Sequence, residues 1–152
     1  MKVILSMMFN IILAGLIFLQ VPNSDSTNSI HYTRMYSDSL GVTHFSDEKM
    51  AMDLVNPGHG IQPTPASQLI STKGLLFFCP PAKSFVDWHK SPGIQYNLIL
   101  SGKFEVEVSD GEKRIFVPGD ILLVEDIIGK GHRTKILGND SACFAVIILL
   151  NK

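Results

Sequence analysis

The sequence has few cysteines, no excess of charge of either sign and, after residue 22, no long stretch with helical periodicity. Its two cysteines, Cys79 and Cys143, are too few for a disulfide framework or a zinc-ligand cluster. Thirteen Lys and Arg residues balance fourteen Asp and Glu residues, and no basic stripe is present, which argues against nucleic acid as the main partner. The hydrophobic fraction of 45% over 152 residues is enough for the core of one domain.

The first segment is a hydrophobic leader. Residues 3–21 are almost wholly apolar, and Lys2 is the only charge before them. A positive start followed by an apolar run is typical of a secretory signal peptide. The run is also long enough for a membrane-anchoring helix, and a wrongly assigned start codon is the third alternative. We therefore predict that residues 1–22 are a signal peptide or an anchor. Both place the folded part outside the cytoplasm, either exported (periplasmic or extracellular) or membrane-anchored.

A polar linker and an arm follow the leader. Residues 22–40 are rich in Ser, Asn and Asp without periodicity, which is the composition of a linker. Residues 43–48 are the start of an arm strand, and proline and glycine punctuate the chain after it. We predict a linker and N-terminal arm over residues 23–72, with residues 41–70 wrapping the outside of a barrel.

The segment 73–152 has the sequence pattern of a β-barrel. Phe104, Val106 and Val108 alternate with charged residues, as in a half-buried strand, and Asp110-Gly111 is a strong hairpin signal. Turn residues separate further short apolar runs at 75–79, 84–89, 94–100, 115–117, 121–124, 132–137 and 142–150. Seven or eight short strands with turns between them predict an all-β sandwich or barrel.

Several motifs in this segment resemble one superfamily. They are Asp87-Trp88-His89 followed by Gln95-Tyr96, Leu100-Ser101-Gly102, Pro118-Gly119-Asp120, and the stretch from Glu125-Asp126 to Gly129-Lys130-Gly131-His132. Over residues 73–150 the chain resembles the cupin superfamily, and within it a group of small, mostly uncharacterised bacterial cupin-domain proteins. The resemblance implies an antiparallel jelly-roll barrel. It does not imply one reaction, because cupins include dioxygenases, isomerases, decarboxylases, lyases and binding proteins.

The resemblance also implies a site inside the barrel. Metal-binding cupins bring three histidines and a carboxylate together, and the matching positions here are Asp87, His89, Gln95 and His132. Two histidines and one aspartate are ligands that iron, manganese or zinc can use. Gln95 then completes the shell or binds the substrate. The alternative is a metal-free pocket whose polar side chains hydrogen-bond one another.

Charged residues near the two glycines of the last motif are candidates for the barrel mouth. Lys130 or Arg133 could bind an anionic substrate there, and Glu125 or Asp126 could move a proton. The alternative is a solvated loop.

Two further features leave alternatives open. Trp88 and Tyr96 are expected to face away from the site and to pack against the arm, or to form a dimer contact. Cys79 and Cys143 are two buried thiols, or a disulfide if the domain is exported.

Three functions follow from these observations, and the sequence does not decide between them. The first is an exported or anchored cupin that holds a small polar ligand, with metal-assisted chemistry on a small acid or sugar-like substrate. The second is a metal-free small-molecule binding protein without catalysis. The third is a dimerising structural module.

Overall fold

The computed structural model describes residues 29–150, and in this range the chain forms twelve strands and no helix. The leader predicted over residues 1–22 lies outside the described residues. No helix of the described part is long and apolar enough to cross a membrane. The strands are β1 (His31–Ser37), β2 (Thr43–Lys49), β3 (Asp53–Val55), β4 (Thr64–Ala66), β5 (Thr72–Phe78), β6 (Phe85–His89), β7 (Gln95–Ser101), β8 (Phe104–Val108), β9 (Lys113–Phe116), β10 (Ile121–Glu125), β11 (His132–Ile136) and β12 (Cys143–Leu149).

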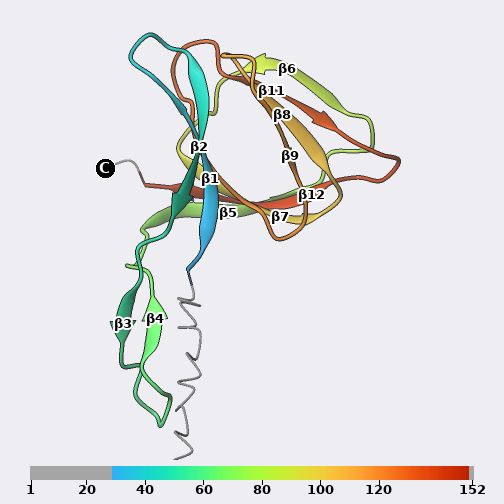
Figure 1. The fold of residues 1–152 in the computed structure, drawn as a ribbon. Coiled ribbons are helices and arrows are strands. Elements are labelled where there is room, and N and C mark those ends of the chain that lie inside the picture. The colour runs from blue at the N-terminus through green and yellow to red at the C-terminus, as the bar shows by residue number, and fades with distance from the viewer. Residues whose placement is uncertain (1–28, 151–152) are drawn as a thin grey trace, which may run out of the picture.

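Two sheets face each other and enclose the core (Figure 1). The larger sheet has the strand order β2-β1-β10-β7-β12-β5, and the smaller one has the order β6-β11-β8-β9. All pairings are antiparallel except that of β1 with β10, which is parallel. The expected antiparallel all-β barrel is confirmed, and each predicted apolar run contains or overlaps a strand.

The barrel begins earlier in the chain than expected. β1 lies in the segment that reads as a linker, yet it pairs with β10 and places Met35 in the core with no exposed surface. Its other residues are polar or aromatic, and none of them is fully buried. The predicted arm strand is β2, which forms the edge of the larger sheet beside β1.

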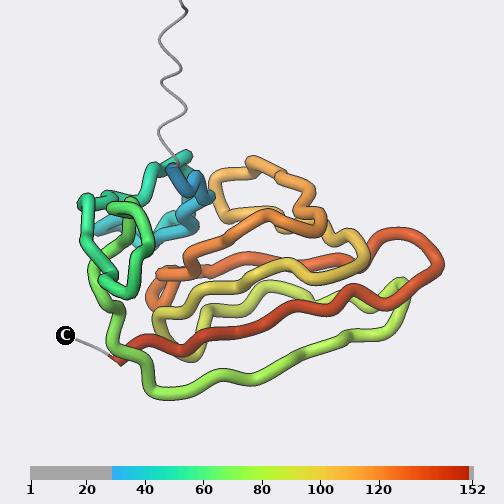
Figure 2. Tube along the Cα trace, turned by 90° about the horizontal axis from the view of Figure 1, so that it is seen from below, coloured from blue at the N-terminus to red at the C-terminus, as the bar shows by residue number. Residues whose placement is uncertain are grey.

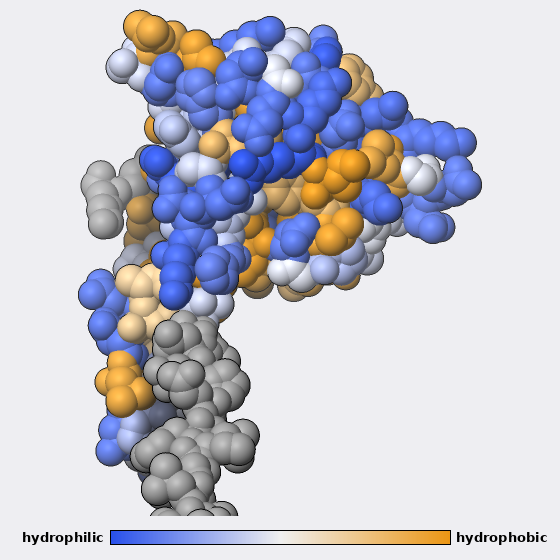
Figure 3. Space-filling model, viewed as in Figure 1, coloured by the Kyte–Doolittle hydropathy of each residue, from blue (hydrophilic) through white to orange (hydrophobic). Residues whose placement is uncertain are grey.

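The rest of the arm does not wrap the barrel. β3 and β4 pair only with each other, as a separate hairpin that projects from the barrel (Figure 1). Leu54 and Val55 on this hairpin are exposed, and Figure 3 shows apolar surface there.

The core lies between the two sheets. Phe104 stacks on Phe116 with ring centroids 5.5 Å apart and contacts Phe144 at the same distance. The alternation expected in β8 is confirmed, because Phe104, Val106 and Val108 are buried and the glutamates between them are half-buried. The remaining members of the buried cluster are Met35, Phe45, Ile99, Leu122, Val124, Ile136 and Ala142.

A disulfide joins the edge strand β5 to the sheet. Cys79 directly follows β5, Cys143 begins β12, and the two are bonded. β5 pairs with β12 alone, and every residue of β5 is exposed. Figure 2 shows β5 (green) running alongside β12 (red) at the margin of the barrel. The disulfide therefore fixes the end of a strand that few side-chain contacts hold.

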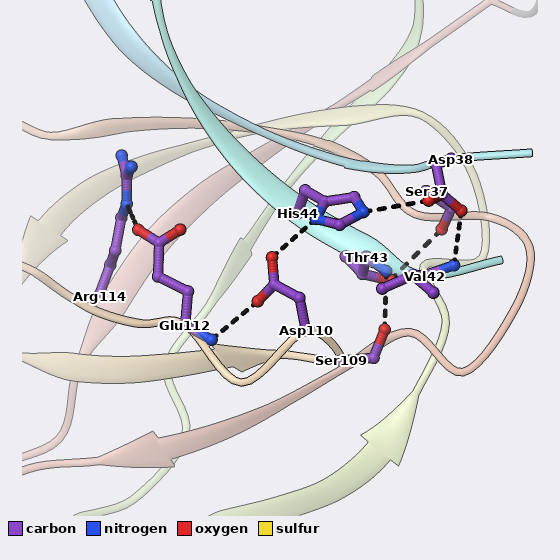
Figure 4. Close-up of polar contacts among 9 residues, drawn as sticks. All are labelled: Ser37, Asp38, Val42, Thr43, His44, Ser109, Asp110, Glu112 and Arg114. Atoms are coloured by element: carbon purple, nitrogen blue, oxygen red, sulfur yellow. Dashed lines mark hydrogen bonds and ion pairs between the residues drawn. The ribbon is translucent and has the colours of Figure 1, made fainter. Parts of the chain in front are cut away.

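A histidine on β2 bridges the turns that carry Asp38 and Asp110 (Figure 4). His44 on β2 lies between Asp110, whose Oδ2 is 2.7 Å from its Nδ1, and Asp38, whose Oδ2 is 3.2 Å from its Nε2. The bond to Asp38, followed by that to Asp110, raises the pKa of His44 above its ordinary value of 6.5. The backbone N–H of Val42 and then His44 lower the pKa of Asp38. Protonated His44 can donate to both carboxylates at once, whereas the neutral ring has one N–H.

This bridge predicts a pH dependence of stability. The folded-state pKa of His44 is raised, so its stabilising effect is complete below pH 6.5 and is lost as the pH rises through the folded-state pKa. The effect should be modest, because the side chain is 31% exposed. We expect the Tm of the wild type to exceed that of His44→Gln at about pH 5.5 and the gap to narrow towards about pH 9. A gap that widens with rising pH would contradict the bridge.

Candidate functional site

A cavity of about 720 Å³ lies between the two sheets and beneath the edge strands β5 and β6. Most of its lining is apolar and comes from both sheets: Leu76, Phe78, Phe85, Val86, Phe104, Val106, Leu122, Val124, Ile136, Phe144 and Val146, together with Pro80, Pro81 and Pro92. The polar side chains that line it include His89, Gln95, Asn97, His132 and Thr134. The cavity thus offers a large apolar wall and a small set of polar groups.

His89 reaches the cavity because of an irregularity in β6. Against β11, His89 pairs with His132 and Val86 pairs with Thr134, so two residues of β6, Asp87 and Trp88, lie opposite one residue of β11. This is the signature of a β-bulge, which inverts the inside–outside alternation of a strand. Both Val86 and His89 line the cavity as a result. The ring Nδ1 of His89 lies 2.8 Å from the carbonyl oxygen of Asp87, within the bulge.

His132 lies opposite His89 and is held from behind by a buried carboxylate. The two imidazole centroids are 4.3 Å apart. His132 Nδ1 is 2.5 Å from Oδ2 of Asp126, a residue with no exposed surface. Because carbonyl and carboxylate oxygens only accept, Nδ1 carries the hydrogen in both rings, and the free ring nitrogen of each is Nε2.

Two amides on β7 complete the polar group. Gln95 and Asn97 both line the cavity, and Gln95 Nε2 donates to Asn97 Oδ1 across 3.1 Å. Gln95 was expected from the sequence, whereas Asn97 was missed. The signal was available, since residues two apart on a strand face the same side.

The strand order and pairing described above decide the architecture: two facing sheets of a small antiparallel jelly roll. This is the antiparallel jelly-roll barrel that the resemblance to cupins implies. Neither a protein-family model nor a curated protein matches the sequence.

Solved structures of similar shape include three bacterial proteins. One is a Cupin 2 conserved barrel domain protein from Leptotrichia buccalis, with 18% identity and a TM-score of 0.39 over 54% of this chain and 38% of that one. Another is a predicted oxalate decarboxylase from Thermotoga maritima, with 23% identity and a TM-score of 0.42 over 66% and 94% of the two chains. The third is a cupin superfamily protein from Desulfitobacterium hafniense, with 22% identity and a TM-score of 0.39 over 65% and 99%. At this level of likeness, none of them informs the ligand or reaction of the present chain.

Within this barrel, five of the expected site residues do not line the cavity. Asp126 is buried behind His132. Asp87 is exposed. The bulge in β6 turns its side chain to the opposite face of the strand from that of His89. Glu125 is ion-paired with Arg34 of β1. Arg133 donates two hydrogen bonds to Glu107, of 2.9 and 2.8 Å, and lowers its pKa. Lys130 lies over the ring of Trp88, with Nζ 3.7 Å from the centroid.

The outward direction expected for Trp88 and Tyr96 agrees with their contacts. Trp88 lies beneath Lys130 and Arg133 rather than against the arm. Tyr96 contacts Tyr32 of β1 with centroids 6.0 Å apart, and burial raises its pKa.

The donor set in the cavity does not fit the expected iron, manganese or zinc ion. Such ions need three or four strong ligands, whereas the cavity offers two imidazoles and two neutral amides. Within residues 29–150, no three His, Cys, Asp or Glu side chains are grouped so that they could hold a metal ion. The carboxylate of Asp126 does not line the cavity, because it lies behind His132 and bonds to its Nδ1.

Proposed function

We propose that this cupin barrel binds a small, largely apolar molecule that carries one polar group. The observation that supports this is the lining of the cavity, in which apolar residues, prolines included, are twice as numerous as polar ones. The polar side chains include His89, His132, Gln95 and Asn97. Ligand sites of this kind gain affinity from the apolar surface and fix orientation with a few polar groups.

The polar group of the ligand would lie at the two imidazoles and the amides. Each imidazole offers an Nε2 lone pair, and each amide can donate as well as accept. A hydroxyl or carbonyl compound suits such neutral partners. The small acid or sugar-like substrate that was first expected would leave polar groups against Phe104, Phe144 and Val146, at a cost in free energy for each.

We also propose that the protein works outside the cytoplasm. The Cys79–Cys143 disulfide supports this, because disulfides persist in oxidising compartments and are rare in the cytosol.

Narrowing the entrance of the cavity should weaken binding of an apolar probe. Val86 lines the cavity near the open edge and is 47% exposed, so Val86→Trp can be accommodated while it narrows the entrance. We expect it to weaken binding of anilinonaphthalene sulfonate, an aromatic probe with one polar head, by about tenfold or more. Val117→Trp is the matched control, since Val117 is 39% exposed and lies outside the cavity. Fluorescence titration measures both variants. Equal affinity in the two, or no binding to the wild type, would contradict the proposal.

A further inference from the structure

The arrangement of Asp126 and His132 is that of a proton-transfer pair. Asp126 has no exposed surface, and His132 is 8% exposed and borders the cavity. Their bond of 2.5 Å places the hydrogen on Nδ1, so the Nε2 lone pair is the basic one. When Nε2 accepts a proton, the ring becomes a cation whose charge the buried carboxylate stabilises.

The second oxygen of Asp126 strengthens this interpretation. Among the residues that the structure describes, Asp126 Oδ1 is the one buried side-chain oxygen or nitrogen without a hydrogen-bond partner. A buried carboxylate with a purely structural role would be expected to have both oxygens satisfied. In the described part of the chain, His132 is the one side chain that forms a hydrogen bond with the Asp126 carboxylate.

His89 supplies a second acid–base group on the same side of the ligand. Its ring centroid is 4.3 Å from that of His132, which leaves no room for a substrate between the rings. Its hydrogen bond to the Asp87 carbonyl fixes the tautomer with Nε2 free. Two neighbouring bases on one face suit a transfer in which the proton leaves one atom and returns to another on the same face.

We infer that the barrel is a metal-independent catalyst of proton transfer, acting on enolisable carbonyl compounds with an apolar body. The inference rests on the proposed ligand site, because the substrate must occupy that cavity. His132 Nε2 takes the proton from the carbon next to the carbonyl. The electron pair of the broken C–H bond forms the C=C bond of an enolate, and the π pair of the carbonyl moves onto its oxygen. The proton then returns to a different atom, from His132 or through His89, and yields an isomer. Atoms and electrons balance without an oxidant or a cofactor.

The test uses nitrobenzisoxazole, an aromatic carbon acid that opens to a coloured phenolate when a base removes its C–H proton. With the wild type, we expect turnover well above that of free imidazole at the same concentration, and no effect of a chelator. His132→Gln should lower kcat by about a hundredfold or more. Asp126→Asn, which changes a positioning residue, should lower kcat while KM stays within about threefold. His31→Gln, on the exposed start of β1, is the control and should equal the wild type.

Binding of the probe is measured separately, by displacement of anilinonaphthalene sulfonate from each variant. Displacement without turnover by the wild type would overturn this inference and leave the binding proposal standing. No displacement from the wild type would overturn both. Turnover that survives in His132→Gln, or that a chelator abolishes, would also overturn the inference. If Asp126→Asn fails to fold, His132→Gln decides, because its side chain lies at the cavity wall.

Discussion

Removing the Cys79–Cys143 disulfide should lower the free energy of unfolding by about 4 kcal/mol. The bridge closes a loop with a sequence separation of 64, and the unfolded chain gains the entropy of that loop when the bond is absent. The folded state has little to compensate, because β5 is an edge strand with one partner and exposed side chains. We expect β5 to fray from β12 and to open the cavity beside Leu76 and Phe78.

Urea denaturation of the wild type and of the double variant Cys79→Ser, Cys143→Ser measures the loss. Reductant should lower the free energy of unfolding of the wild type to nearly that of the variant and should leave that of the variant unchanged. This comparison separates the effect of the bond from the effect of the substitutions. A double variant as stable as the oxidised wild type would contradict the expectation. Thiol labelling of the protein taken from its native cells tests the proposed location, and a fully reduced pair there would contradict it.

The strands of the barrel were predictable because their signal is local. Phe104, Val106 and Val108 alternate with charges, and the turns at Asp110-Gly111 and Pro118-Gly119 separate neighbouring runs. β1 was missed because its inward residues, Met35 among them, are too few to show alternation among polar neighbours. Its place in the sheet is set by pairing with β10, far along the chain.

The site was predictable only in part. His89, His132 and Gln95 line the cavity as expected, because they occupy the positions that the resemblance to cupins indicates. Asp87 was expected beside His89, but that expectation assumes regular alternation, and the bulge in β6 depends on pairing with β11. Asp126 was expected at the barrel mouth as a group that could move a proton, but its buried position behind His132 was not foreseen. Its six-residue separation from His132 reads as a charged loop, and the pair meets only because the chain turns back through Gly129 and Gly131.

Gly131 allows the backbone beside His132 to approach the backbone of His89 closely. Gly131 has a φ of +77°, a conformation that residues with a side chain rarely adopt. A Cβ on Gly131 would lie 1.9 Å from the carbonyl oxygen of His89 and 2.5 Å from its carbonyl carbon. The neighbour is backbone and cannot rotate away. Any side chain at this position must therefore push β6 from β11 at the point where His89 and His132 pair.

Gly131→Ala should accordingly cost about 3 kcal/mol or more of stability and should weaken probe binding, because it displaces one wall of the site. Gly111→Ala is the matched control. Its φ is +99°, but nothing lies within 4 Å of a Cβ there, so only backbone strain of about 1–2 kcal/mol applies. Urea denaturation and fluorescence titration of both variants separate the two contributions. Equal losses in the two would show that strain alone matters. A larger loss at Gly131, with binding lost as well, would show that the close packing of Gly131 on His89 builds the site.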